Sequence, residues 1–135
     1  MKKNKAVGYL FISFFIIGFL CMIYYGYQFW HHFAFISGKA IAVTPASYKG
    51  SVDYSIVFEY TVDGKLYHGN DDPNFCRGQD RAQIKDLLLG KPFPVVYGIK
   101  SPSVGHMLLN QDYADKFKYT LPDLVRYYDS VLNCK

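Results

Sequence analysis

A long uncharged segment near the N-terminus constrains this chain more than any other feature. No Asp, Glu, Lys or Arg occurs from residue 6 to residue 38, and residues 7–26 are almost wholly apolar. Twenty helical residues at about 1.5 Å each span roughly 30 Å, the thickness of a bilayer's hydrocarbon core. The ten Leu, Ile and Phe residues between Leu10 and Ile23 contribute roughly −3 to −6 kcal/mol toward insertion. The segment therefore predicts a transmembrane helix over residues 7–30.

Two other interpretations of this segment are a cleaved export signal and a lipid anchor on Cys21. A signal has an apolar core of about 7–15 residues and a small residue at its cleavage site. This run is longer, and a lipid anchor would need a small residue where Leu20 stands. Aromatic side chains follow the apolar run and are the residues we expect to anchor the helix at the membrane interface. These are Tyr24, Tyr25, Tyr27 and Trp30.

The flanking charges predict an orientation for the span. Lys2, Lys3 and Lys5 precede it, whereas the first lysine after it is Lys39. Because positive residues are retained on the cytoplasmic side, the N-terminus should be cytoplasmic and the rest extracytoplasmic. From residue 31 onward, twelve Lys and Arg residues stand against eleven Asp and Glu, a balance of +1. That balance gives no electrostatic footprint for nucleic acid.

The clearest local signal after the span is a β-hairpin. In residues 54–62, apolar and aromatic side chains alternate with Ser, Val, Glu and Thr, which is the period of a half-buried strand. Asp63 and Gly64 are the preferred pair for a two-residue type I′ turn. With this turn, Tyr60 faces Tyr67 and Glu59 faces His68.

Shorter patterns predict the remaining elements. They are a strand over 39–45, a polar loop over 46–53, a helix over 80–89, strands around 95–97 and 103–110, and a helix over 121–132. Asp80 is a plausible N-cap of the first helix, and Gly90 ends it. Pro92 and Pro94 place the start of the fourth strand at a sheet edge.

Together these signals predict a single N-terminal transmembrane helix and a small, mainly β domain of the α+β type. About five strands should form a barrel or curled sheet with one short helix, followed by a helical C-terminal tail. The predicted parts are a cytoplasmic tail over 1–6, the membrane helix over 7–30, an interfacial linker over 31–37, the β-domain over 38–109 and the tail over 110–135.

Two motifs in the β-domain resemble a widespread bacterial family of membrane-anchored proteins that contain a domain of unknown function. The first is Y-x-V-x-G-x-x-Y-x-G and the second is G-x-x-x-x-V-x-Y followed by a proline. The matching residues are Tyr60, Val62, Gly64, Tyr67, Gly69, Gly90, Val95, Tyr97 and Pro102. Family members commonly have Asp where Gly98 stands here. The resemblance covers residues 38–109 and implies a small membrane-tethered β-domain in the bacterial cytoplasmic membrane, without implying catalytic residues.

Histidines and one cysteine of the predicted domain provide candidate metal ligands. His68 and His106 fall on predicted strands, and an approach of these histidines to each other or to Cys76 would suit a small metal-binding sensor or enzyme. Zinc sites combine three or four ligands with close pair spacing, and the sequence contains no C-x-x-C or H-x-x-x-H pair. His31 and His32 are adjacent and would point about 100° apart on a helix, so headgroup contact is favoured for them.

A run of oxygen donors follows the hairpin. It contains Asn70, Asp71, Asp72 and Asn74. An EF-hand calcium loop would also require Gly at its sixth position and Glu at its twelfth, and both are missing. Turn formation explains these residues more simply, because Asn and Asp side chains bond to their own backbone.

Cys76 and Cys134 are a candidate disulfide. An extracytoplasmic domain lies in an oxidising compartment, where an isolated pair tends to form a bridge. The bridge would contribute on the order of 4 kcal/mol in the chain-entropy model. The alternative is a pair of free thiols.

The sequence favours a non-catalytic protein without cofactors, whose β-domain binds or scaffolds a partner in the cell envelope. The expected partners are the lipid bilayer and another envelope protein or a second copy of this chain. Candidate contact residues are Glu59, Thr61, Tyr67, Tyr127 and Tyr128, with core packing as the alternative for the tyrosines. The other functional classes are the metal-binding sensor or enzyme described above and an immunity-type membrane protein.

Overall fold

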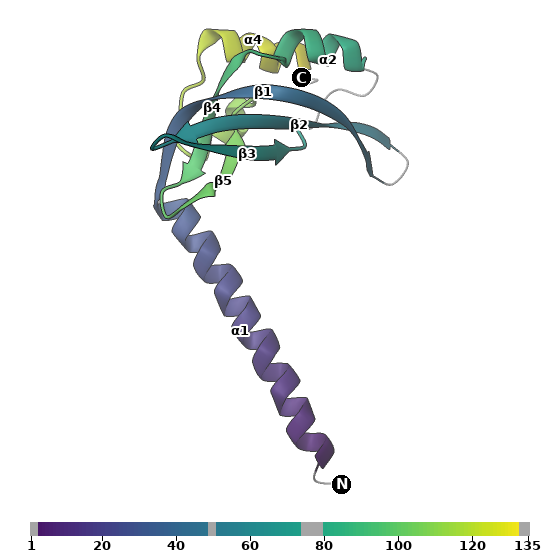
Figure 1. Cartoon of the computed structure of the whole chain (residues 1–135), viewed down its shortest axis with the longest axis vertical. Helices are drawn as coiled ribbons and strands as arrows, with labels where there is room; N and C mark the ends of the chain where they lie inside the picture. Colours follow the sequence, from purple (N-terminus) through teal and green to yellow (C-terminus); the bar gives the residue numbers. More distant parts are fainter. Residues whose placement is uncertain (1–2, 49–50, 74–79, 133–135) are drawn as a thin grey trace.

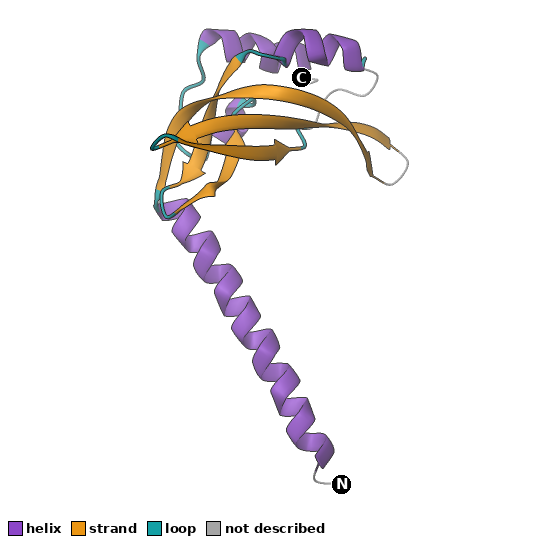
Figure 2. Ribbon diagram, viewed as in Figure 1, coloured by secondary structure: helices purple, strands orange, loops and turns teal. Residues whose placement is uncertain are grey.

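A computed structural model describes residues 3–48, 51–73 and 80–132 of the chain. A long helix leads into a β-barrel that carries three short helices (Figures 1 and 2). The elements are α1 (Lys3–His31), β1 (Phe33–Tyr48), β2 (Ser51–Val62), β3 (Lys65–Asp71), α2 (Arg81–Leu88), β4 (Pro92–Gly98), β5 (Ser101–Met107), α3 (Gln111–Asp115) and α4 (Asp123–Leu132).

Helix α1 is apolar and projects away from the barrel (Figure 1). Its segment Phe11–His31 is long and apolar enough to cross a membrane, and its large side chains are exposed. A helix that is apolar on all sides is stable in protein or lipid surroundings rather than in water. By length and composition, this helix fits either a membrane anchor or a signal sequence.

The five strands form one antiparallel sheet in the order β3-β2-β1-β4-β5, curled into a nearly closed barrel. Strand β1 is shared by both halves, because Phe33–Lys39 pairs with β4 and Gly38–Tyr48 pairs with β2. The register shifts between Ala40 and Ala42, where a bulge bends the strand. This architecture confirms the predicted class of an apolar N-terminal helix followed by a small five-stranded β-domain.

The predicted hairpin is confirmed residue by residue. Tyr60 pairs with Tyr67 and Glu59 pairs with His68 across the turn. Asp63 and Gly64 have φ values of 50° and 77°, as a type I′ turn requires. Tyr60 on β2 reaches across the barrel to the edge strand β5, where its hydroxyl donates a 2.6 Å hydrogen bond to the carbonyl of Pro102.

Two glycines make room for aromatic rings inside the barrel. A Cβ atom on Gly69 would lie 2.2 Å from Cζ of Phe58, and one on Gly105 would lie 2.5 Å from the hydroxyl oxygen of Tyr60. Real Cβ atoms essentially never show such distances. Packing therefore requires glycine at position 69, the last position of the first motif.

Helices α2 and α4 both contribute buried residues to the core on one side of the barrel, and together we call them the helical cap (Figure 1). Asp80 accepts a hydrogen bond from the Ala82 amide and caps α2, as predicted. The guanidinium of Arg81 donates to the carbonyl of Val43 and ties α2 to β1. The residues of the cap that are buried in the core are Ile84, Leu88, Val125, Tyr128 and Leu132.

Three predicted boundaries differ from the structure. The linker over 31–37 is wrong, because α1 ends at His31 and β1 begins at Phe33, where Phe and Ile side chains suit a strand paired with β4. The polar loop over 46–53 is also wrong, because β1 and β2 remain paired as far as Tyr48 and Ser51. The predicted tail over 110–135 is not separate, because it contributes Ala114, Phe117 and most of α4's buried face to the same core.

The fourth strand contains the predicted residues 95–97, whereas the fifth, predicted over 103–110, begins and ends earlier, at Ser101 and Met107. The β4–β5 pairing starts at Val95, so Pro92 lies beyond the stretch of β4 that β5 covers. The turn between these strands falls at Ile99 and Lys100.

Candidate functional site

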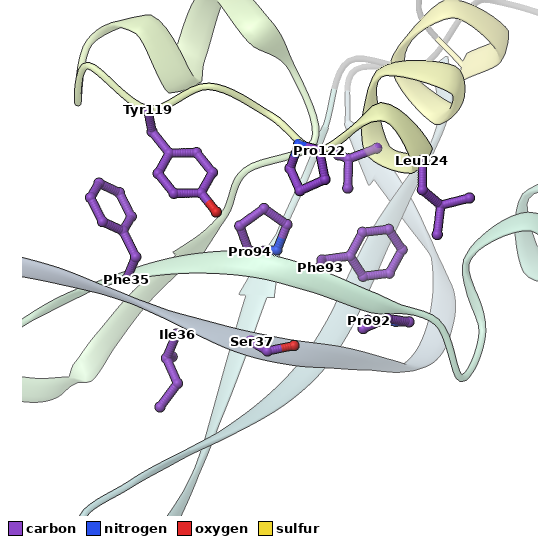
Figure 3. A pocket seen from close by; sticks show the side chains of 10 residues that line it. Phe35, Ile36, Ser37, Pro92, Phe93, Pro94, Tyr119, Pro122 and Leu124 are labelled. Atoms are coloured by element: carbon purple, nitrogen blue, oxygen red, sulfur yellow. The ribbon is translucent and has the colours of Figure 1, made fainter.

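An open groove of about 410 Å³ runs between the paired strands β1 and β4 and the C-terminal segment (Figure 3). In the close-up, Phe35 on β1 and Tyr119 on the C-terminal segment face each other, and their ring centroids are 4.5 Å apart. The lining residues are Phe35, Ile36, Ser37, Pro92, Phe93, Pro94, Tyr119, Pro122, Leu124 and Val125. This lining is almost entirely aliphatic, aromatic or proline, as in ligand and peptide grooves.

Side chains at the rim of the groove are exposed. Phe35 is 38% exposed and Leu124 is 48% exposed, whereas Phe93 and Val125 form a buried floor. An apolar rim over an apolar floor favours binding of an apolar segment rather than a charged ligand.

Gln111 holds the wall of the groove in place. Its amide nitrogen donates to the Tyr119 carbonyl at 3.2 Å, and its amide oxygen accepts from the Leu121 amide at 3.3 Å. The backbone turns sharply at Lys118, which has a φ of 55°. Tyr119 therefore has a fixed position opposite Phe35.

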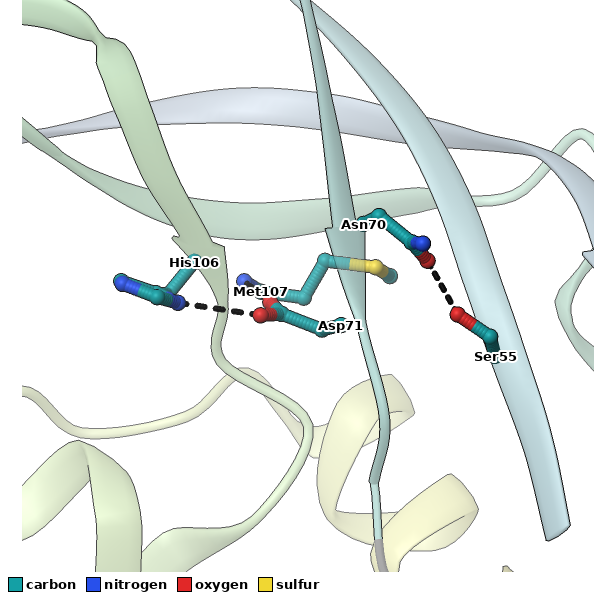
Figure 4. A network of polar contacts seen from close by, with 5 residues as sticks. All are labelled: Ser55, Asn70, Asp71, His106 and Met107. Carbon is teal, nitrogen blue, oxygen red and sulfur yellow. Dashed lines mark hydrogen bonds and ion pairs between the residues drawn. The ribbon is translucent and has the colours of Figure 1, made fainter. Parts of the chain in front are cut away.

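A second candidate feature is a polar link between the edge strands β3 and β5 (Figure 4). One carboxylate oxygen of Asp71 lies 3.0 Å from Nδ1 of His106, and the other accepts a 2.5 Å hydrogen bond from the Met107 amide. Beside it, the Ser55 hydroxyl donates to the Asn70 side-chain oxygen. The hydrogen bond to Asp71 raises the pKa of His106 above its ordinary value of 6.5, although burial acts in the opposite direction.

The end of α1 packs against the barrel through aromatic rings, which we call the helix junction (Phe29, Trp30, Phe33 and Phe117). Trp30 stacks on Phe117 with centroids 5.0 Å apart and an interplanar angle of 8°. Phe29 lies 6.1 Å and Phe33 lies 5.1 Å from the same Phe117 ring, each edge to face. Such pairs are worth about 0.5–1.5 kcal/mol beyond their buried area.

Gly98 allows the helix junction to form. A Cβ atom on this residue would lie 3.3 Å from Cδ2 of Phe29, a tight contact. A larger side chain at this position would crowd the Phe29 ring.

The predicted contact residues fall into different environments. Thr61 and Tyr127 are exposed, while Glu59 and Tyr67 are half-buried on the hairpin. Tyr128 is buried, with its ring 5.7 Å from that of Phe93, which agrees with core packing, the alternative given for the tyrosines. Its position on the inner face of the amphipathic helix α4 explains its burial.

The predicted interface aromatics Tyr24, Tyr25, Tyr27 and Trp30 are all exposed on α1. The ring of Tyr27 lies 4.1 Å from that of His31 one turn later. Cys21 is exposed on the same helix.

The predicted disulfide and metal sites are only partly covered by the structure. Cys76, Cys134 and Asn74 lie outside the described residues. His68 pairs with Glu59 on β3, whereas His106 contacts Asp71 on β5. Within residues 3–48, 51–73 and 80–132, no group of three His, Cys, Asp or Glu side chains is placed to hold a metal ion.

Sequence reasoning missed the groove residues Phe35 and Tyr119. Phe35 lies in the segment predicted as a linker, and Tyr119 lies in the predicted tail. The alternation of Phe33 and Phe35 with smaller residues was the available signal for a strand.

The chain matches no family model, and searches of curated proteins and solved structures found no significant similarity. The resemblance described above therefore rests on its two motifs alone.

Proposed function

We propose that this chain is a non-catalytic interaction module of the cell envelope, held in the membrane by α1 with its barrel on the extracytoplasmic side. In this proposal, the groove binds an apolar segment of a neighbouring membrane protein. The observation that carries the proposal is the exposed apolar rim formed by Phe35 and Leu124 over a buried floor.

The position of the groove supports a partner from the same membrane. The ring of Phe35 lies 5.6 Å from that of Phe33, which belongs to the helix junction. One end of the groove is therefore continuous with the point where α1 enters the barrel. A partner segment emerging from the bilayer would reach the groove directly.

The helix junction supports retention of α1. Its last turn supplies Phe29 and Trp30, which pack on Phe117. Removal of α1 as a signal sequence would uncover Phe117, a side chain that is 3% exposed in the complete chain. Exposure of a large aromatic side chain costs about 1.5–3 kcal/mol, which favours an anchor that stays attached.

Site-specific photo-crosslinking in cells tests the groove. A photoreactive phenylalanine analogue at Leu124 should crosslink a specific membrane partner. The matched position is Leu66, which is 51% exposed on β3 and belongs to the hairpin face. A partner captured at Leu66 and not at Leu124 would show that the partner binds the hairpin rather than the groove. Capture at neither position would contradict the proposal.

A substitution pair identifies the partner as a groove ligand. Leu124→Asp places a charge on the apolar rim and should abolish the crosslink from a second groove position, Phe35. Leu66→Asp adds the same charge to the hairpin and should leave that crosslink intact. A product at twice the mass of the chain would identify the partner as a second copy.

A further inference from the structure

The fold gathers basic side chains around the exit of α1 that are far apart in sequence. Lys100 lies in the β4–β5 turn, whereas Lys116 and Lys118 follow α3. All of them are exposed. We call this set the lysine collar (Lys100, Lys116 and Lys118).

Backbone bonding fixes Lys100 at the level of the helix end. The amide of Ile99 donates a 2.9 Å hydrogen bond to the carbonyl of His32, the first residue after α1. Ile99 is 55% exposed, so the turn presents an aliphatic side chain beside a lysine. This is the pattern of a loop that lies at the boundary between lipid and water.

The stacked rings of Phe117 and Trp30 place Lys116 and Lys118 near the end of α1 as well. Lys116 and Lys118 are the immediate neighbours of Phe117, whose ring stacks on Trp30. The ammonium of Lys116 lies 5.5 Å from the Tyr113 ring centroid. Trp30 is 47% exposed, and tryptophan at the end of a membrane helix lies at the depth of the lipid headgroups.

Two exposed carboxylates of α3, Asp112 and Asp115, lie on the same segment as Lys116 and Lys118 and offset part of the collar's charge. Asp115 accepts a 2.6 Å hydrogen bond from the Gln111 side chain, and Asp112 lies in the first turn of α3. Asp71 is engaged by His106 and the Met107 amide. His31 and His32 are also exposed at the exit.

We propose that the lysine collar binds the phosphate groups of anionic phospholipids and so holds the barrel against the membrane surface. This inference rests on the proposed retention of α1 in the bilayer. Lysines near a membrane surface attract anionic lipids within about a Debye length. Three lysines around one helix exit would enrich such lipids beside Trp30.

Trp30 is the single tryptophan of the chain and reports directly on its lipid neighbours. The full-length protein is reconstituted in phosphatidylcholine bilayers that contain a fixed fraction of brominated phosphatidylglycerol or brominated phosphatidylcholine. Bromine quenches tryptophan fluorescence on contact. We expect quenching by the anionic lipid to exceed that by the zwitterionic lipid by about threefold in apparent affinity at low salt.

The substitution K100Q/K116Q/K118Q should reduce that preference to about one. The matched variant K39Q/K85Q/K91Q removes the same charge from β1, from α2 and from the residue before β4, and should keep the preference. The variant K100R/K116R/K118R retains the charge and should behave as the parent does. It also keeps the test valid if the glutamine variant fails to fold.

The outcomes separate this proposal from the proposed function. Equal quenching by both lipids in the parent protein would overturn the collar and leave membrane anchoring intact. Quenching by neither lipid would place Trp30 outside the bilayer and overturn both. A preference that survives K100Q/K116Q/K118Q, or disappears in K39Q/K85Q/K91Q, would assign the effect to net charge and overturn the collar.

Discussion

The helical cap and the helix junction cover different parts of the barrel with different chemistry. The cap buries aliphatic side chains completely: Ile84 and Leu88 are 0% exposed. The junction uses aromatic rings and leaves Trp30 47% exposed. The cap therefore forms part of the hydrophobic core of the barrel. The junction leaves an amphipathic aromatic side chain partly exposed, which suits the boundary between lipid and water. The chain thus covers one side of the barrel with α2 and α4 and another with the end of the long apolar helix α1.

Removal of a cap side chain should have the largest effect on stability. Leu88→Ala leaves a cavity in the core and should lower the free energy of unfolding by about 2–5 kcal/mol. Chemical denaturation of the full-length protein in detergent, followed by circular dichroism, measures this change. Leu89, which is 36% exposed, provides the control. Equal effects of Leu88→Ala and Leu89→Ala would contradict the assignment of the cap to the core.

Disruption of the polar link between β3 and β5 should have an intermediate effect on stability. Asp71→Asn weakens the charge-assisted bonds to His106 and the Met107 amide and should cost about 1.5–3 kcal/mol. Asp72→Asn removes the same charge from the adjacent exposed residue and should cost less than about 0.5 kcal/mol. The denaturation measurement above compares the two variants. A loss as large for Asp72→Asn would show that net charge, rather than the link between β3 and β5, is responsible.

In the helix junction, Trp30 and Phe117 should show a smaller and specific energetic coupling. A double-mutant cycle with Trp30→Ala and Phe117→Ala should give about 0.5–1.5 kcal/mol of interaction free energy, because the two rings stack. The cycle uses unfolding free energies of the full-length protein in lipid nanodiscs. Additive effects of the two substitutions would mean that the helix end and the barrel are independent.

The smallest expected effect depends on pH. Because the folded-state pKa of His106 is raised above 6.5, its contact with Asp71 stabilises the fold fully below that value. The stabilisation is lost as pH rises through the folded-state pKa. The His106 side chain is 39% exposed, so solvent screening limits the contribution to less than about 1 kcal/mol.

Comparison of His106→Gln with the parent protein measures this contribution. The stability difference between them should be larger near pH ~5 than near pH ~8. A difference that grows with rising pH would reverse the sign of the linkage and contradict the role assigned to the Asp71 carboxylate.

Local signals explain what the sequence could predict of the fold. The hairpin followed from Asp63 and Gly64, and α2 followed from Asp80 and the spacing of Ile84 and Leu88. Each of these signals acts within a few residues of its element. They needed no knowledge of the rest of the chain.

Long-range contacts explain what the sequence could not predict. Residues 33–37 pair with β4, about sixty positions later, so the start of β1 looked like an extension of the apolar helix. The spacing of apolar residues predicted the helix that is α4, but not which of its side chains are buried or the surface that it covers. The groove depends on Gln111 placing Tyr119 opposite Phe35, and the lysine collar depends on Phe117 stacking on Trp30. Neither pairing has a signature in the sequence.

The central claim is that α1 stays attached to the barrel as a membrane anchor. Intact-mass analysis of the protein recovered from membranes after extraction at alkaline pH tests it most directly. We predict a single membrane-bound species that retains residues 1–30. A soluble species that lacks this segment, released freely from cells or membranes, would contradict the claim.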